Sequence, residues 1–115
     1  MPLGHLSDLT PKPVSNPAAH DAAMRVLVGP EQGWTDHVMR VFDLAPGGYT
    51  PKHQHDWPHI NYILAGEGSL FLNGKENPIQ AGSYAYVPAN ALHQFRNTSD
   101  KPLQFICIVP TSGHY

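Results

Sequence analysis

Short runs of β-branched and aromatic residues alternate with turn-forming residues from Met24 onward. Runs of this kind, bounded by Gly, Pro, Asn and Asp, are typical of β-strands, and no segment carries apolar residues at helical spacing over three turns. We therefore predict an all-β protein in which any helix is a short turn. The predicted strands are Met24–Val28, His37–Leu44, Ile60–Leu64, Ser69–Leu72, Tyr84–Val87, Leu92–Arg96 and Leu103–Val109.

The turn signals between these strands indicate how the strands pair. Pro46-Gly47-Gly48 ends one strand and Gly66-Glu67-Gly68 breaks another. Asn73-Gly74 supplies the two residues with positive φ that a tight type I′ hairpin requires. Because tight hairpins join antiparallel neighbours, we expect a mostly antiparallel sandwich or barrel.

The first 23 residues differ from the rest of the chain because prolines are dense there. Prolines at this density disfavour both a helix and a central strand. We interpret residues 1–23 as an extended arm that packs on the body or on a partner chain, and residues 24–115 as one folded domain, since 115 residues suit a single core. The prolines of the arm are Pro2, Pro11, Pro13 and Pro17.

Composition and charge exclude several classes of partner. The chain is 41% hydrophobic with a formal charge of -2, so it is folded and has no basic field for nucleic acid or anionic lipid. It has no apolar stretch long enough to span a membrane and no signal-peptide pattern, which predicts a cytoplasmic protein. Cys107 is the only cysteine, so a metal ion would be held by nitrogen or oxygen atoms.

Four of the eight histidines are spaced for one metal site. His53 and His55 are two residues apart, so both imidazoles point to the same face of an extended segment. His59 follows Pro58, which indicates a bend, and His93 begins a strand after a turn. A single histidine is more often an ordinary surface residue, but four in this arrangement favour a metal site. The remaining histidines have no motif around them and are interpreted as surface residues: His5, His20, His37 and His114.

The same segments resemble the two motifs of the cupin superfamily, G-x5-H-x-H-x3or4-E-x6-G and G-x5-P-x-G-x2-H-x3-N. His59 stands where the family usually has glutamate, and Asn90, which tolerates positive φ, stands where it usually has glycine. The resemblance is to small single-domain cupins with a four-histidine site, and it implies a double-stranded β-helix, that is, a jelly-roll barrel. The matching residues are Gly47, His53, His55, His59 and Gly66, then Gly82, Pro88, Asn90, His93 and Asn97.

The predicted cofactor is one divalent transition-metal ion per chain, bound by His53, His55, His59 and His93. Imidazole suits several metals; we favour Mn or Fe, with Ni, Cu, Zn and Co as alternatives. Four neutral imidazoles leave the full +2 charge of the ion, which makes it a stronger Lewis acid. The resemblance implies coordination positions open toward the barrel mouth. We expect an enolate, a 2-keto acid, dioxygen or peroxide to occupy them.

Two classes of function remain open at this point. The first is a metal-dependent oxidoreductase of dioxygenase type acting on a small anionic or enolizable substrate, with a metal-dependent sugar isomerase as a variant. The second is a non-catalytic module that binds or senses a small ligand, which the lack of a general base in the motifs favours. No individual catalytic residue is assigned.

The pocket and the assembly can also be predicted. Trp57 lies between ligands and either lines the pocket mouth or only packs, whereas Phe95 shares the inward face of His93. Phe105 and Cys107 share one face of the last strand and are predicted to line the pocket, with Cys107 as an inert filler. Related small cupins are commonly dimers, so we predict a homodimer whose arm or edge strand crosses to the partner.

Overall fold

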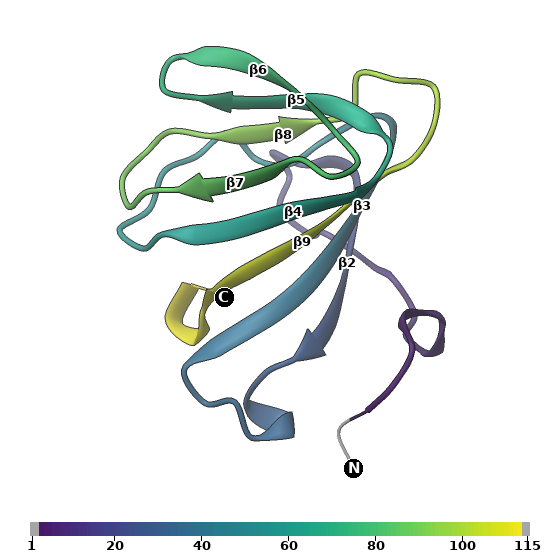
Figure 1. Cartoon of the computed structure of the whole chain (residues 1–115), viewed down its shortest axis with the longest axis vertical. Coiled ribbons are helices and arrows are strands. Elements are labelled where there is room, and N and C mark those ends of the chain that lie inside the picture. Colours follow the sequence, from purple (N-terminus) through teal and green to yellow (C-terminus); the bar gives the residue numbers. More distant parts are fainter. Residues whose placement is uncertain (1–2, 114–115) are drawn as a thin grey trace.

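The computed structural model describes residues 3–113, which form one antiparallel sheet that curls on itself (Figure 1). The sheet order is β6-β5-β8-β3-β9-β4-β7, and β2 pairs with both β3 and β1. Every strand pair is antiparallel, which confirms the predicted all-β, antiparallel class. The strands are β1 (Lys12–Pro13), β2 (His20–Val28), β3 (His37–Tyr49), β4 (His59–Ala65), β5 (Glu67–Leu72), β6 (Lys75–Gln80), β7 (Tyr84–Val87), β8 (Gln94–Arg96) and β9 (Leu103–Pro110).

Among the described residues, helical structure is limited to three single turns, as predicted. These 3-10 turns are η1 (Leu6–Asp8), η2 (Pro30–Gln32) and η3 (Thr111–Gly113). Residues 3–113 contain no α-helix, and within this range no helix is long and apolar enough to cross a bilayer.

All seven predicted strands are present, but β1 and β6 were not predicted. β2 begins at His20 rather than Met24. The residues of β6, Lys75 to Gln80, include Pro78 and few apolar side chains, which disguises a strand. Because β6 lies at one end of the sheet order, its proline breaks no ladder on the open side.

Two turns fix the register of the sheet. Asn73 and Gly74 have φ of 57° and 76°, and the hairpin that they form pairs Leu72 with Lys75, as the predicted type I′ turn requires. Gly66 has φ of 90°, and a Cβ atom there would collide with the carbonyl oxygen of Pro102. The break between β4 and β5 therefore depends on glycine for both conformation and space.

The segment before β2 lies along the sheet rather than apart from it. Lys12 and Pro13 pair with Met24 and Ala23, and Val14 packs against the core. The division into an arm and a barrel domain at residue 23 stays a prediction. Residues 1–2 and 114–115, which include His114, lie outside the described part of the chain.

The inward faces of the strands build a core that runs into a pocket. Leu44, Leu103 and Phe105 are at most 1% exposed and form the centre of this core. Phe95 and Phe105 stack with ring centroids 4.3 Å apart and belong both to the core and to the pocket wall. The core thus provides a rigid floor beneath the candidate site.

Candidate metal centre

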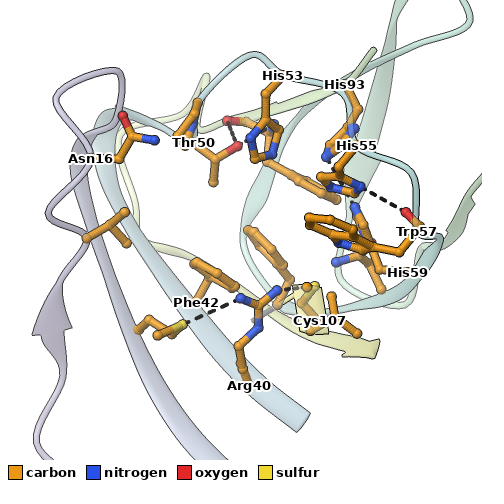
Figure 2. Close-up of a pocket in the computed structure, with 18 of the residues that line it drawn as sticks. Asn16, Arg40, Phe42, Thr50, His53, His55, Trp57, His59, His93 and Cys107 are labelled. Carbon is orange, nitrogen blue, oxygen red and sulfur yellow. Dashed lines mark hydrogen bonds between the residues drawn. The ribbon is translucent and has the colours of Figure 1, made fainter. Parts of the chain in front are cut away.

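A cavity of about 620 Å³ lies inside the curled sheet (Figure 2). It contains all eight residues that the sequence nominated for the site, the four histidines together with Trp57, Phe95, Phe105 and Cys107. Arg40, Phe42, Thr50 and Asn61 also line it, as does the N-terminal segment from Lys12 to Asn16. A volume of this size is in the usual range for small-molecule sites.

Backbone pairing brings the two histidine segments together. His53 and His93 form an isolated antiparallel bridge in which each N–H donates to the other's carbonyl oxygen, at 3.1 and 3.0 Å. The N–H of Asn90 donates to the carbonyl oxygen of His55 at 2.6 Å, and Asn90 has φ of 68°, the left-handed conformation expected of it. His59 is the first residue of β4, directly after the bend at Pro58.

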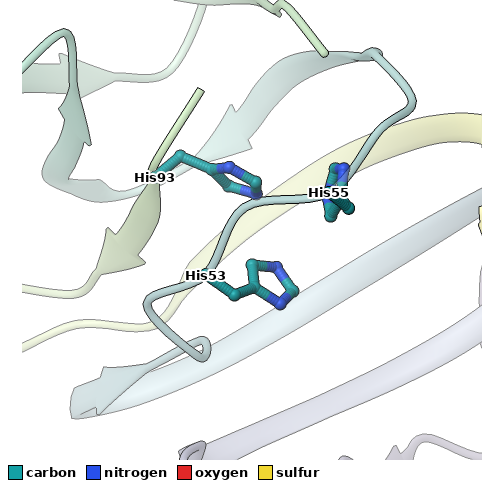
Figure 3. A group of neighbouring side chains, drawn as sticks. All are labelled: His53, His55 and His93. Carbon is teal, nitrogen blue, oxygen red and sulfur yellow. The ribbon is translucent and has the colours of Figure 1, made fainter. Parts of the chain in front are cut away.

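Three imidazoles converge on one point (Figure 3). One ligand nitrogen from each of His53, His55 and His93 lies within 4.8 Å of the other two. His59 is not part of this set, although its Nε2 atom lies only 3.2 Å from Nε2 of His93. The described residues therefore hold a three-histidine cluster with a fourth imidazole beside it.

Hydrogen bonds at Nδ1 determine which nitrogen of each ring faces the cluster. Nδ1 of His55 lies 2.8 Å from the carbonyl oxygen of Trp57, and Nδ1 of His93 lies 2.9 Å from that of Ala91. Carbonyl oxygens only accept, so both Nδ1 atoms carry hydrogen and both Nε2 atoms are free to bind a cation.

Asn61 orients the fourth imidazole in the same way. Nδ2 of Asn61 donates to the carbonyl oxygen of Ile106 at 3.2 Å, which directs Oδ1 toward His59. Nδ1 of His59 donates to that Oδ1 at 2.7 Å. Metal-binding histidines usually have such a fixed partner on the other ring nitrogen.

The donor set fits a metal ion. Nδ1 carries the hydrogen in both His59 and His93, so the Nε2 atoms of these two rings are lone-pair acceptors. They face each other at 3.2 Å. Two such atoms repel unless a cation lies between or beside them. An assembly of neutral imidazole nitrogens suits a divalent transition-metal ion, and the residues present can hold one.

The surroundings favour the neutral form of His53, His59 and His93. Loss of surrounding water, with smaller contributions from His93, His55 and Arg40, lowers the pKa of His53 to about 4. Burial, together with His93, lowers the pKa of His59 to about 3, against the opposing effect of the hydrogen bond that Nδ1 of His59 donates to Asn61. Burial also lowers the pKa of His93. Neutral rings at pH 7 are what metal ligation requires.

Trp57 connects the site to the end of the described chain. Its ring stacks on the imidazole of His55 with centroids 4.4 Å apart and an interplanar angle of 4°. Gly113, in η3, lies against the same indole, and a Cβ atom at position 113 would overlap its Nε1, Cε2 and Cδ1 atoms. Both interpretations of Trp57 therefore hold, because its side chain lines the pocket and also packs against Gly113.

Sequence reasoning did not identify Arg40, Phe42, Thr50 or Asn61 as lining residues, and for two of them a signal was available. Asn61 shares the inward face of β4 with His59, and this two-residue spacing was the available signal. Arg40 shares the inward face of β3 with the apolar residues Val38, Phe42 and Leu44. A charged residue in register with apolar neighbours was the signal in that case.

Among the described residues, the other three histidines lie outside the pocket. His5 and His20 are exposed, and His37 is partly buried with its ring stacked on Trp34 at 5.1 Å. Their placement agrees with the absence of a motif around them.

Comparison with known families decides the affiliation of the chain. The family Cupin_2, described as a cupin domain, matches residues 40–109. The chain is a cupin. The match includes both motif segments, so the resemblance carried by the histidine spacing extends through most of the barrel strands, from β3 to β9.

Similar proteins support this cupin fold over nearly the whole chain. The oxalate-binding protein of Thermotoga maritima is 29% identical over 107 residues, which cover 90% of this chain and 88% of that protein. The structure of the polyketide cyclase RemF from Streptomyces resistomycificus matches with a TM-score of 0.90 and 28% identity, covering 96% of this chain and 79% of RemF.

A further structural match comes from a Thermotoga maritima protein described as a predicted oxalate decarboxylase. Its TM-score is 0.85 at 28% identity, with 94% of this chain and 97% of that chain covered. The cupin spans less than half the length of the other curated relatives that it matches. These likenesses confirm the double-stranded β-helix fold.

Proposed function

We propose that this cupin is a metal-dependent oxidoreductase of dioxygenase type that acts on a small anionic or enolizable substrate. The observation that carries the proposal is the convergence of His53, His55 and His93 at one end of a cavity of about 620 Å³. A closed structural site would leave no room for a substrate, whereas this cluster borders open space.

His59 is the fourth ligand in this proposal. Its Nε2 atom lies 3.2 Å from that of His93, and Asn61 holds the ring in the tautomer that leaves Nε2 free. A small rotation of neighbouring side chains would bring all four nitrogens to one ion. The bound divalent ion, Mn or Fe in our preference, would polarise a coordinated substrate and exchange electrons with dioxygen.

The protein's own groups orient the reaction. The backbone bridge between His53 and His93 keeps the two segments in register, and the stacked Phe95 and Phe105 close the floor against bulk water. No Asp or Glu lines the pocket within residues 3–113. Redox chemistry on a substrate that already carries its negative charge requires no carboxylate base, so this lining is compatible with the oxidoreductase.

Metal analysis followed by oxygen uptake tests the proposal. The purified protein is expected to bind about one divalent ion per chain, as one site implies. Protein loaded with Mn or Fe should consume dioxygen with acetylacetone, a flavonol or phenylpyruvate, and 18O2 label should enter the product. Protein loaded with Zn, which has no redox chemistry, is the matched control.

Other outcomes of the same experiment separate the alternatives. Metal binding without turnover of any substrate would favour a module that binds or senses a small ligand. Interconversion of sugar phosphates without oxygen uptake would favour a metal-dependent isomerase. Failure to bind any divalent ion at pH 7 would contradict the proposal itself.

The proposal includes a homodimer. β7 ends the sheet order, and Tyr84 and Tyr86 on it are 86% and 60% exposed. Ile60 and Tyr62 on the neighbouring β4 add further exposed apolar surface beside them. Such an edge is a natural place for a second copy. Light scattering at micromolar concentration is expected to give twice the chain mass, and a monomer would contradict this part.

A further inference from the structure

The arginine inside the barrel has a different environment from its neighbour on the next strand. Arg25 on β2 forms an ion pair with Asp43, with Nη2 and Oδ2 2.7 Å apart. Arg40 on β3 lines the cavity and makes no ion pair within residues 3–113. Two arginines on adjacent strands therefore differ in whether the protein supplies an anion.

The contacts of Arg40 are weak ones for a guanidinium. Nη2 lies 3.1 Å from Sγ of Cys107, and Nη1 lies 3.9 Å from Sδ of Met24. The guanidinium carbon lies 5.0 Å from the centroid of the Phe42 ring. The Nε atom is buried and has no hydrogen-bond partner among the described residues. Thioether and thiol sulfur are poor acceptors, so the donors of this side chain remain largely unused.

A half-buried guanidinium without a carboxylate partner costs folding free energy when its Nε atom is shielded from water, which indicates that it serves another purpose. Its planar fork of donors matches a carboxylate with two parallel hydrogen bonds. Figure 2 shows the guanidinium pointing into the same cavity as the imidazoles, and its charge contributes to the lowered pKa of His53 and His59.

The cavity around Arg40 favours an anion with an apolar body. Its lining includes Arg40 and Lys12 and no Asp or Glu within residues 3–113. Three phenylalanines stack along one wall, with Phe105 between Phe42, at a centroid separation of 5.3 Å, and Phe95, at 4.3 Å. The volume of about 620 Å³ accommodates a ring-containing ligand rather than only a two-carbon acid.

We propose that Arg40 binds the carboxylate of an aromatic acid whose opposite end reaches the histidine cluster. This inference rests on the proposed function for the role of the histidines, but the role of Arg40 does not depend on it. The substrate class becomes an aryl carboxylate that carries an oxygen donor, such as a phenol or an enol, at the end remote from the acid. The phenylalanine wall contacts the ring between the two ends.

Titration with a matched pair of probes tests the role of Arg40. The probes are 4-hydroxybenzoate and 4-hydroxybenzamide, which share shape and phenol but differ in charge. Binding is followed by 15N NMR of the backbone and of the arginine Nε–H groups, on chelator-treated protein and on Zn-loaded protein. We expect the wild type to prefer the acid by at least about tenfold, as a charge-assisted pair implies.

Three variants isolate the guanidinium. Arg40→Gln should reduce the acid-to-amide preference to near unity, and Arg40→Lys should retain part of it because charge remains while the planar fork is lost. Lys12→Gln removes the other cation of the lining and should change the preference less than about twofold, since Lys12 is exposed and solvent-screened.

Each other outcome overturns the proposal. Equal affinity for the two probes in the wild type, or an unchanged preference in Arg40→Gln, would show that Arg40 is only a packing residue. Loss of the preference in Lys12→Gln alone would assign it to the general field of the pocket. Because the titration is also made without metal, failure of metal binding would refute the proposed function and leave this test intact.

Discussion

The two ends of the cavity satisfy their polar groups in opposite ways. At the histidine end, the Nδ1 atoms of His55, His59 and His93 each have a protein acceptor within 2.9 Å, and only the Nε2 side is left free. At the arginine end, Arg40 meets sulfur atoms and an aromatic ring, and its Nε atom has no partner among the described residues. One end is preorganised by the fold, and the other depends on what enters.

This difference indicates a division of labour between a resident ion and a transient ligand. A permanently bound ion has a higher affinity when protein groups hold its ligands in place before it binds. A ligand that binds and leaves again gains affinity from unpaired donors, because donors that already have a hydrogen-bond partner in the protein contribute none. The predictions below test whether the two ends behave independently.

The largest expected effect is on metal content. His55→Ala or His93→Ala should weaken metal binding by more than about 100-fold, because losing even an outer partner of a ligand costs about 10- to 100-fold. Plasma mass spectrometry after gel filtration measures the ions per chain. Arg40→Gln is the comparison variant and should keep its metal. Unchanged ion content in His93→Ala would remove the histidine end from the metal site.

A smaller effect is expected at the residue that orients His59. Asn61→Leu should weaken metal binding by about 10- to 100-fold without abolishing it, because the His59 ring loses the acceptor of its Nδ1 proton. Asn61→Asp, which keeps an acceptor oxygen, should retain most of the affinity. Competition with a fluorescent chelator gives the constants. Equal losses in the two variants would mean that Asn61 acts through packing alone.

An effect of intermediate size is expected on the pH dependence of the free energy of unfolding. The folded-state pKa values of His53 and His59, about 4 and about 3, lie below 6.5, so the unfolded chain binds protons first as pH falls. Metal-free protein should therefore lose stability from about pH 6.5 downward, at up to about 1.4 kcal/mol per pH unit for each such proton. Urea unfolding between pH 7 and pH 4.5 measures this. A free energy of unfolding that stays constant over this range would contradict the prediction.

The smallest expected effect is a change in thermal stability when Arg40 is replaced. Arg40→Met removes a charge that the protein does not neutralise and replaces it with an apolar chain of similar length. We expect a gain of about 1 kcal/mol, or about 4 °C in Tm for a domain of this size. Calorimetry of the metal-free protein measures the change. A loss of several degrees would show that the contacts of Arg40 with Phe42 and Cys107 are structural.

The sequence predicted the histidine end better than the arginine end for a physical reason. His53 and His55 lie in one short segment, and the turn before His93 carries Pro88 and Asn90, so local spacing carries most of the information. The proximity of Arg40 to Cys107 comes from the pairing of β3 with β9, 67 residues apart. Register between distant strands is set by the whole core rather than by a local motif.

The fold shows the same limit. Strands rich in β-branched and aromatic residues, such as β7 and β9, were located to within a residue at each end. β6 has no such pattern, and its existence depends on the hairpin at Asn73-Gly74 and on pairing with β5. The start of β2 at His20 was missed because its first residues, His20 and Asp21, are exposed and polar. Pairing partners, not intrinsic preference, define these elements.

The contact between Gly113 and Trp57 links the last described turn, η3, to the histidine cluster. The indole is a rigid plate that transmits displacement, so a bulkier residue at 113 would tilt it and carry the stacked His55 ring along. The spectroscopic properties of a bound ion would then report substitutions made far from any ligand. The last described turn, η3, therefore influences the orientation of one imidazole of the histidine cluster.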